Sequence, residues 1–360
     1  MYYSYPVATG MSFDSAPGWD YIDDDNNTGF VEDDTMQTKG QVIISLLIGM
    51  LISITAFSAG GQTVMAVQVN IFGDGNPENG VEDSREQVLG GWKEGLGLSD
   101  QRRNAGTVKC DGKNRGTAMV VDTHEFADDL KGVVLASAAH VFYDLETNSP
   151  FEHCEFHFLA LGELSAYRAK IDLNNVRMGD YDPVMATGSV EFGEGDWAFV
   201  YVPRPWRNFA SGESTRLHDF FSIQLESFQQ SGGEFSLIAF DSSLAVISTS
   251  RNCTVIESVH DDLGGGGWKG QLLDDCDSAD GASGGGIVAV IEGQEYLVGI
   301  RNGSHWSEEE FPGSEYPLGP PDGSVWSRHT NTNFARGIDS YMINELEKFV
   351  KGLEKEEKYF

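Results

Sequence analysis

The chain has 360 residues, enough for one large domain or for two halves that share a sizeable buried core. Acidic residues outnumber basic ones by 56 to 24, which gives a formal net charge of −32 at pH 7. This balance excludes nucleic acid as an expected partner, because phosphate binding needs clustered Lys and Arg.

The first 58 residues form two segments of different composition. Residues 1–35 hold eight acidic residues and neither Lys nor Arg, which predicts a disordered acidic extension. Residues 36–58 combine Lys39, an apolar run over 42–56 and a small-x-small end, the pattern of a secretory signal peptide. Because a signal peptide begins a chain, we interpret Met36 as the start of translation and the first 35 residues as an untranslated extension.

The apolar run has a second interpretation, as a signal anchor. Residues 42–59 would form a helix of about 27 Å, barely the thickness of a bilayer core, and would tether the protein to a membrane. Lys39 precedes the run in either case, so the bulk of the chain is expected outside the cytoplasm. We therefore expect a secreted or periplasmic protein, with a membrane-anchored form as the alternative.

The rest of the chain divides near residue 106. Residues 59–105 are Gly- and Asn-rich and are interpreted as a propeptide or N-terminal extension, with a helix near 81–92. Residues 106–357 form the predicted main domain, in which short apolar runs alternate with polar turns. These runs predict strands at 116–121, 133–137, 155–161, 167–171, 197–202, 236–240, 286–291 and 295–300.

Many short strands without helical periodicity between them indicate an all-β sandwich or barrel. The end of the chain differs, because apolar residues recur there at i, i+3 and i+4 spacing and predict a helix packed on the body. The apolar positions are Ile338, Tyr341, Met342, Leu346, Phe349, Val350 and Leu353.

Four cysteines are present, and none of them forms a C-x-x-C pair of the kind found in zinc and redox motifs. An even number in an exported chain predicts two disulfides, and three pairings are open. We favour Cys110–Cys154 and Cys253–Cys276, since each joins neighbours within one half of the chain.

One serine lies in a glycine-rich turn directly before an apolar strand, at Ser283 in Gly281-Ala-Ser-Gly-Gly. A serine hydroxyl becomes nucleophilic only when a base takes its proton, and glycines let backbone N–H groups approach a reacting carbonyl. Such a turn is also common before ordinary strands. Two further polar residues strengthen the catalytic interpretation: His140 ends the run Val133–Ala139, and Asp196 directly precedes the run that begins at Trp197.

These three blocks, in the order His, Asp, Ser, resemble the motifs of the chymotrypsin-like serine peptidases. Ser-Ala-Ala-His140 is similar to Thr-Ala-Ala-His, Asp196-Trp-Ala-Phe-Val to Asp-Ile-Ala-Leu, and the Ser283 block to Gly-Asp-Ser-Gly-Gly. The sequence around Ser283 is most similar to that of secreted bacterial members, including glutamyl endopeptidases. The resemblance covers residues 106–350 and implies two packed six-stranded antiparallel β-barrels with a C-terminal helix.

The resemblance also implies roles for particular residues. Ser283 would be the nucleophile, His140 the general base and acid, and Asp196 the residue that orients the imidazole. The backbone N–H groups of Gly281 and Ser283 would form the oxyanion hole. Ala282 departs from the family pattern, because it replaces the aspartate that pairs with a freed N-terminal amine in trypsin-type zymogens. Activation of that kind is therefore not expected.

Substrate preference stays open at this stage. Asp277 lies six residues before Ser283, where trypsin-like members keep the carboxylate that binds Arg or Lys, although glutamyl endopeptidases also carry an Asp there. Arg301 lies near the position that recognises an acidic side chain in that branch, and its alternative is a solvent-exposed arginine. If Arg301 paired with Asp277, their charges would cancel and neither preference would follow.

The leading hypothesis is an exported serine endopeptidase that acts on polypeptide substrates without a cofactor. The eight histidines show no metal-ligand spacing, so no metal is expected. The rival hypothesis, from another class, is a catalytically inactive protease-fold module that binds proteins or surfaces.

Overall fold

In the computed structural model, the described residues all belong to the unit Thr63–Phe360. They are 71–73, 83–87, 104–127, 130–144, 147, 149–158, 168–181, 194–203, 214–242, 246–259, 269–307, 310 and 322–357. The expected acidic extension, signal segment and membrane tether lie outside them. No helix within these ranges is both long enough and apolar enough to span a membrane.

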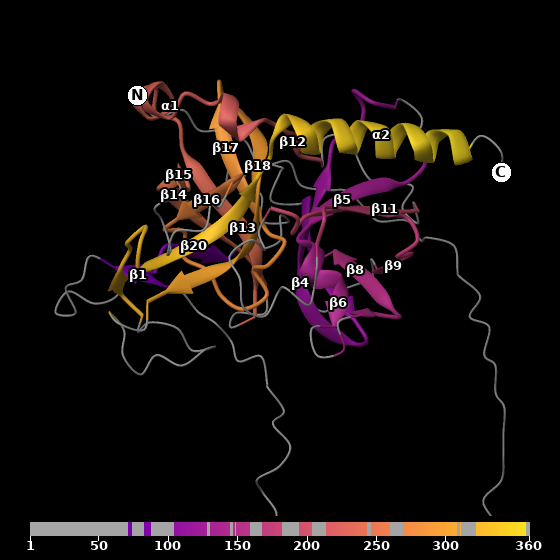
Figure 1. The fold of residues 1–360 in the computed structure, drawn as a ribbon, viewed down its shortest axis with the longest axis horizontal. Coiled ribbons are helices and arrows are strands. Elements are labelled where there is room, and N and C mark those ends of the chain that lie inside the picture. Colours follow the sequence, from indigo (N-terminus) through magenta and orange to yellow (C-terminus); the bar gives the residue numbers. More distant parts are fainter. Residues whose placement is uncertain are drawn as a thin grey trace, which may run out of the picture. The chain divides into compact units, whose positions relative to one another are not determined.

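The first sheet has seven antiparallel strands in the order β10-β11-β5-β4-β3-β8-β9. Figure 1 labels β4, β5, β8, β9 and β11 of this sheet. Strands β9 and β10 follow each other in sequence with only residues 172–175 between them, yet they lie at opposite ends of this order. The sheet must therefore curl until its two edges approach, as in a barrel. Its strands are β3 (Ala105–Cys110), β4 (Lys113–Val121), β5 (Val133–Ser137), β8 (Cys154–Phe158), β9 (Arg168–Ile171), β10 (Val176–Met178) and β11 (Ala198–Val202).

The second sheet has nine strands: eight follow the order β15-β16-β20-β18-β17-β13-β14-β2, and β12 pairs with β18. Strands β14 and β15 are separated by Thr254 alone but lie near opposite edges, so this sheet is curled as well. Its strands are β2 (Arg85–Gln87), β12 (Arg216–Leu217), β13 (Phe235–Asp241), β14 (Val246–Cys253), β15 (Val255–Glu257), β16 (Gln271–Asp274), β17 (Gly286–Ile291), β18 (Gln294–Trp306) and β20 (Asn331–Gly337).

Smaller elements complete the described fold. Two short strand pairs are β1 (Phe72–Gly73) with β19 (Ser324–Val325), and β6 (Tyr143–Asp144) with β7 (Ser149–Pro150). The helices are α1 (Leu225–Gln230) and α2 (Ser340–Glu357), with 3-10 turns at Ala139–Phe142 and Phe220–Ser222.

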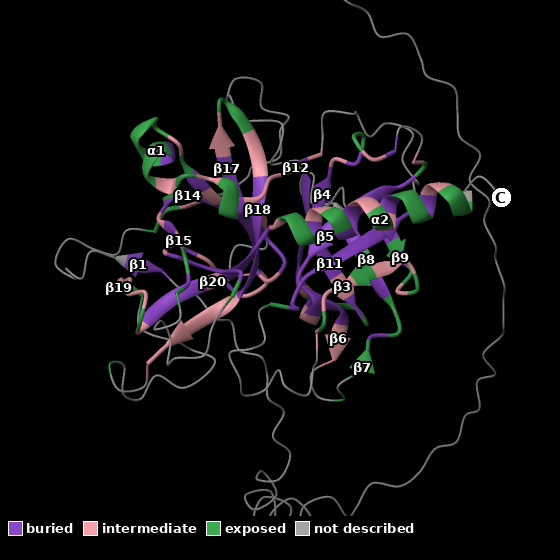
Figure 2. Cartoon of the chain, turned by 45° about the horizontal axis from the view of Figure 1, so that its top comes forward, coloured by how far each residue is buried: buried purple, intermediate pink, exposed green. Residues whose placement is uncertain are grey.

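Helix α2 leaves β20 of the second sheet and packs on the core of the first. Met342, Leu346 and Val350 are fully buried in one hydrophobic cluster with residues of β5 and β11, while the opposite face of the helix is exposed (Figure 2). The helix starts after Asp339, whose carboxylate accepts a hydrogen bond from the Met342 N–H at 2.8 Å and so caps the first turn. The helix thus joins the two sheets.

The predicted all-β class, with two antiparallel sheets and a C-terminal helix, is confirmed. The sheets have seven and nine strands rather than six each. The helix expected near residues 81–92 is wrong where the structure describes it, because Arg85–Gln87 is the edge strand β2, paired with β14. Residues 71–73 and 83–87, from the segment interpreted as a propeptide or extension, therefore lie on the folded body.

Candidate active site

The register of two strands brings His140 and Asp196 together. Ser137 at the end of β5 is paired with Ala198 at the start of antiparallel β11, so residues after Ser137 lie beside residues before Ala198. His140 follows in the 3-10 turn Ala139–Phe142, and Asp196 lies just before β11. Both neighbouring strands are buried, and a rigid frame therefore positions the two side chains.

Asp196 holds His140 through both carboxylate oxygens. Its Oδ2 lies 2.7 Å from His140 Nδ1, and its Oδ1 accepts the His140 backbone N–H at 2.9 Å. The carboxylate is 2% exposed. An ionised carboxylate can only accept, so Nδ1 carries the proton and Nε2 of the neutral ring is left as the acceptor. This is the tautomer that a general base needs.

The charge on His140 is also set by its surroundings. Burial lowers the pKa of the imidazole, but the charge of Asp196 and the hydrogen bond to it raise that pKa, and the net effect is upward. Asn302 supports the pair from β18, since its Nδ2 donates to the backbone oxygen of Asp196 at 3.2 Å. The sequence carried no signal for Asn302, which lies 106 residues away from its partner.

The turn that carries Ser283 is bound to the first sheet next to His140. The Ser283 carbonyl accepts from the Thr117 N–H at 2.7 Å, and Thr117 Oγ1 donates to the Gly281 carbonyl at 2.8 Å. Gly284 has φ +79°, and a Cβ at this position would lie 2.2 Å from Ser137 Oγ. Only glycine fits this close approach. Since Ser137 precedes His140 by three residues, the two blocks meet at one place.

The Ser283 hydroxyl is unpaired among the described residues. Ser283 is partly exposed, and among the described residues its Oγ makes no hydrogen bond, to His140 or to any other group. Burial raises the pKa of the Asp280 carboxyl, and the neighbouring Gly281 N–H opposes that rise. Catalytic hydrogen bonds are often long or misaligned without substrate.

The two residues considered for substrate preference lie apart. Arg301 does not reach solvent, so the exposed alternative is wrong: its side chain is 2% exposed and its Nη2 lies 2.8 Å from Oδ1 of Asp274, which is fully buried. Asp277 instead accepts hydrogen bonds from Phe72 and Ser84. The charges of Asp277 and Arg301 are thus not paired with each other. Sequence reasoning missed Asp274, the last residue of β16, which looks like an ordinary turn residue at a strand end.

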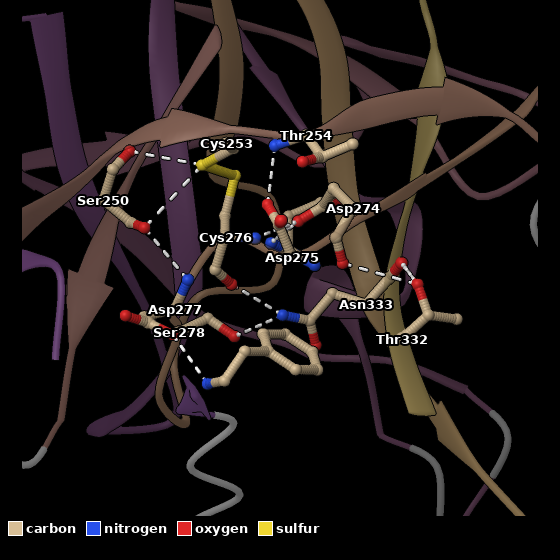
Figure 3. A network of polar contacts seen from close by, with 12 residues as sticks. Ser250, Cys253, Thr254, Asp274, Asp275, Cys276, Asp277, Ser278, Thr332 and Asn333 are labelled. Atoms are coloured by element: carbon tan, nitrogen blue, oxygen red, sulfur yellow. Dashed lines mark hydrogen bonds and ion pairs between the residues drawn. A yellow bond between two sulfur atoms is a disulfide. The ribbon is translucent and has the colours of Figure 1, made fainter. Parts of the chain in front are cut away.

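Both disulfides favoured from the sequence are confirmed. Cys110 and Cys154 are directly paired across β3 and β8, and Cys253–Cys276 links the end of β14 to the segment after β16 (Figure 3). The second disulfide lies in a polar network with Ser250, Asp275 and Asn333 at the base of the serine turn. Within the described ranges, His, Cys, Asp and Glu side chains form no group of three able to hold a metal ion.

Comparisons with known proteins yield structural neighbours only. No protein-family model and no curated protein matches the chain. A Glu endopeptidase solved in complex with MPD is 11% identical with a TM-score of 0.46, over 74% of this chain and 96% of that one. The protease Anisep from Arthrobacter nicotinovorans is 10% identical with a TM-score of 0.44, over 69% and 96%. Such distant likenesses transfer neither residue roles nor an activity to this chain.

Proposed function

We propose that the protein is an exported serine endopeptidase that hydrolyses peptide bonds through His140, Asp196 and Ser283. The observation that carries this proposal is the His140–Asp196 pair, with its tautomer fixed, beside a glycine-rich turn that holds Ser283 against the first sheet. A buried carboxylate, a histidine with a free Nε2 and a partly exposed serine together supply the groups needed for acyl transfer.

In the proposed reaction, these groups act in the order known for a Ser-His-Asp triad. His140 Nε2 takes the proton of Ser283 Oγ as this oxygen attacks the scissile carbonyl, and the Ser283 and Gly281 N–H groups stabilise the oxyanion. The imidazolium then protonates the leaving amine, which departs and leaves an acyl-enzyme. A water molecule, deprotonated by His140, hydrolyses the ester and restores the serine hydroxyl.

Export is supported by the disulfides. Two disulfides are typical of proteins outside the reducing cytosol, and they agree with the signal segment predicted over 36–58. The proposed location is secreted or periplasmic, and an uncleaved 42–59 segment would keep the catalytic part on a membrane outside the cytoplasm.

Ser283→Ala is expected to abolish peptidase activity and labelling by a fluorophosphonate probe, because the probe reacts only with an activated serine. Loss of one member of such a triad lowers kcat by up to about 10⁶-fold. The matched control is Ser222→Ala, which removes an exposed hydroxyl bonded to the Asp219 carbonyl and should leave labelling unchanged. Folded wild-type protein that never labels would refute the peptidase and favour an inactive binding module.

That rival is favoured by one observation: within the described residues, Ser283 Oγ makes no hydrogen bond to His140 or to any other group. The two functions differ in what happens to a bound peptide and to the probe. A peptidase must label with the probe and cleave peptides, whereas a binding module would retain a peptide ligand unchanged and ignore the probe.

Thr117→Val is expected to slow labelling by about tenfold to a hundredfold while the protein stays folded. Thr117 is fully buried; its Oγ1 donates to the Gly281 carbonyl and accepts the Phe240 N–H at 2.8 Å. Valine keeps the shape but leaves both groups unpaired, a loss of about 1–3 kcal/mol per group that loosens the turn. Thr117→Ser retains the hydroxyl and should recover most of the rate. Equal rates in the two variants would show that this bond does not position the turn.

A further inference from the structure

Two short segments that precede the first sheet in sequence pair with strands from the second half of the chain. Strand β1 pairs with β19, and the Ile71 carbonyl accepts the Gly323 N–H at 2.7 Å. Strand β2 extends the second sheet by pairing with β14, where Arg85 faces Ser250. Ile71 is 5% exposed. We refer to residues 71–73 and 83–87 as the N-terminal segments.

One carboxylate joins both N-terminal segments to the serine-bearing stretch. Asp277 Oδ1 accepts the Phe72 N–H at 2.8 Å, and its Oδ2 accepts the N–H and the hydroxyl of Ser84, each at 2.7 Å. Asp277 is 4% exposed, and within the described ranges every hydrogen bond that its carboxylate accepts comes from these two segments. Both oxygens are thus occupied by the protein's own chain.

The groups around Asp277 form a polar network that binds the segment 83–87. Ser250 Oγ bonds both Ser84 Oγ, at 2.7 Å, and the Asp277 N–H, at 2.9 Å, so three residues from distant parts of the chain share one network. Figure 3 shows Ser250 and Asp277 beside the Cys253–Cys276 disulfide that fixes this corner. A second buried carboxylate, Asp241, binds Arg85 Nη1 at 2.9 Å.

We infer that the N-terminal segments are a permanent part of the folded protein. Asp277 binds these segments through hydrogen bonds and does not bind a substrate side chain. Removing the segments would take from Asp277 the three hydrogen bonds that it now accepts and would leave the edge of β14 without its partner strand, both of which are unfavourable. A processing cut that discards everything before β3 would therefore damage the half of the molecule that carries Ser283.

The attachment of the segments can be measured in the purified wild-type protein and its variants. In Asp277→Ala, backbone hydrogen exchange at residues 84–87 should accelerate at least about tenfold, because charge-assisted bonds are lost. Ser84→Ala removes the hydroxyl bond but keeps the N–H bond, so a smaller acceleration is expected. Asp275→Asn is the matched control, since this neighbouring carboxylate accepts from the Thr254 N–H and touches neither segment.

Protection of the β17 amides in the same experiment reports whether each variant is still folded; if Asp277→Ala unfolds, Ser84→Ala carries the test. The processed, probe-reactive wild-type protein should also retain residues 71–87 by mass spectrometry. Unchanged exchange at 84–87 in folded Asp277→Ala and Ser84→Ala, or a probe-reactive protein that lacks the segments, would overturn the inference. Neither readout depends on which peptides are cleaved. If the wild type does not react with the probe at all, that result contradicts the proposed peptidase activity, and the hydrogen-exchange comparison still tests the inference.

Discussion

The Asp196→Asn variant is expected to lose about 10⁴-fold in kcat while it remains folded and binds substrate with nearly the same KM. The reason lies in the two hydrogen bonds from His140. The backbone N–H of His140 needs an acceptor where Oδ1 now is, so the asparagine oxygen must occupy that position. Its NH₂ group then faces Nδ1 and forces the imidazole to present a lone pair there. The proton moves to Nε2, which can no longer act as the base.

The pH profile separates this effect from general damage. In the wild type, burial lowers the His140 pKa, but the charge of Asp196 and the hydrogen bond to it together outweigh burial and raise that pKa. The acid limb of kcat/KM should therefore lie above the ordinary histidine value of about 6.5. Activity is lost as pH falls through that pKa, since the protonated base cannot accept. In Asp196→Asn the attractive charge is gone, and the residual activity should show its acid limb at lower pH.

Asp172→Asn serves as the control, because this exposed carboxylate accepts hydrogen bonds from its neighbours Asn174 and Asn175 in a surface turn. Steady-state kinetics from pH 5 to pH 9 on a peptide substrate would measure both effects. A wild-type kcat in Asp196→Asn, or an acid limb that does not move, would remove Asp196 from the proposed mechanism.

Much of the candidate site was predictable because its residues lie at the ends of apolar strands. The strand ending before His140 and the strand beginning after Asp196 were both recognisable from the sequence, and the register of β5 with β11 brings the two residues together. Gly284 was likewise marked by its sequence context. Its tight approach to Ser137 shows the physical reason for glycine at this position.

The residues missed by sequence reasoning are polar groups buried against distant partners. Thr117 and Gly281 are separated by 164 residues, and Asp274 and Arg301 by 27, so no local pattern relates them. Strand β20 (Asn331–Gly337) was missed because it contains Asn331, Thr332, Asn333 and Arg336, all buried, and lacks the alternation of a half-exposed strand. Likewise, β2 is a three-residue polar edge strand whose pairing depends on Asp277 and Ser250 rather than on apolar periodicity.

Loss of the ion pair between Arg301 and Asp274 is expected to lower the free energy of unfolding more than any other single substitution proposed for this protein. Arg301→Met should lower the free energy of unfolding by about 3–5 kcal/mol, because it leaves the fully buried Asp274 carboxylate without its counter-charge. The double variant Arg301→Met/Asp274→Leu should recover most of the loss, since two apolar side chains of similar volume remove the need for a buried charge. Urea denaturation with the disulfides intact would measure both values.

The stability loss of Arg301→Met should depend on pH, in a direction set by the pKa of Asp274. Burial raises the pKa of Asp274 and Arg301 opposes that rise, with a net upward shift in the folded protein. A carboxyl whose folded pKa is raised contributes most below its unfolded pKa, about 3.9, and that contribution is lost as pH rises through the folded value. Without Arg301 the folded pKa rises further, so the deficit of Arg301→Met should be small near pH 4 and grow toward neutrality.

Arg216→Met is the matched control, because Arg216 pairs with Asp122 at the surface, where its own side chain is 63% exposed. Such pairs contribute about 0–1 kcal/mol, so this variant should unfold almost as the wild type does. If Arg301→Met were no more destabilised than Arg216→Met at neutral pH, Asp274 would have to be satisfied by groups other than Arg301. A double variant as unstable as Arg301→Met would instead locate the effect in packing around the arginine stem rather than in the unpaired charge.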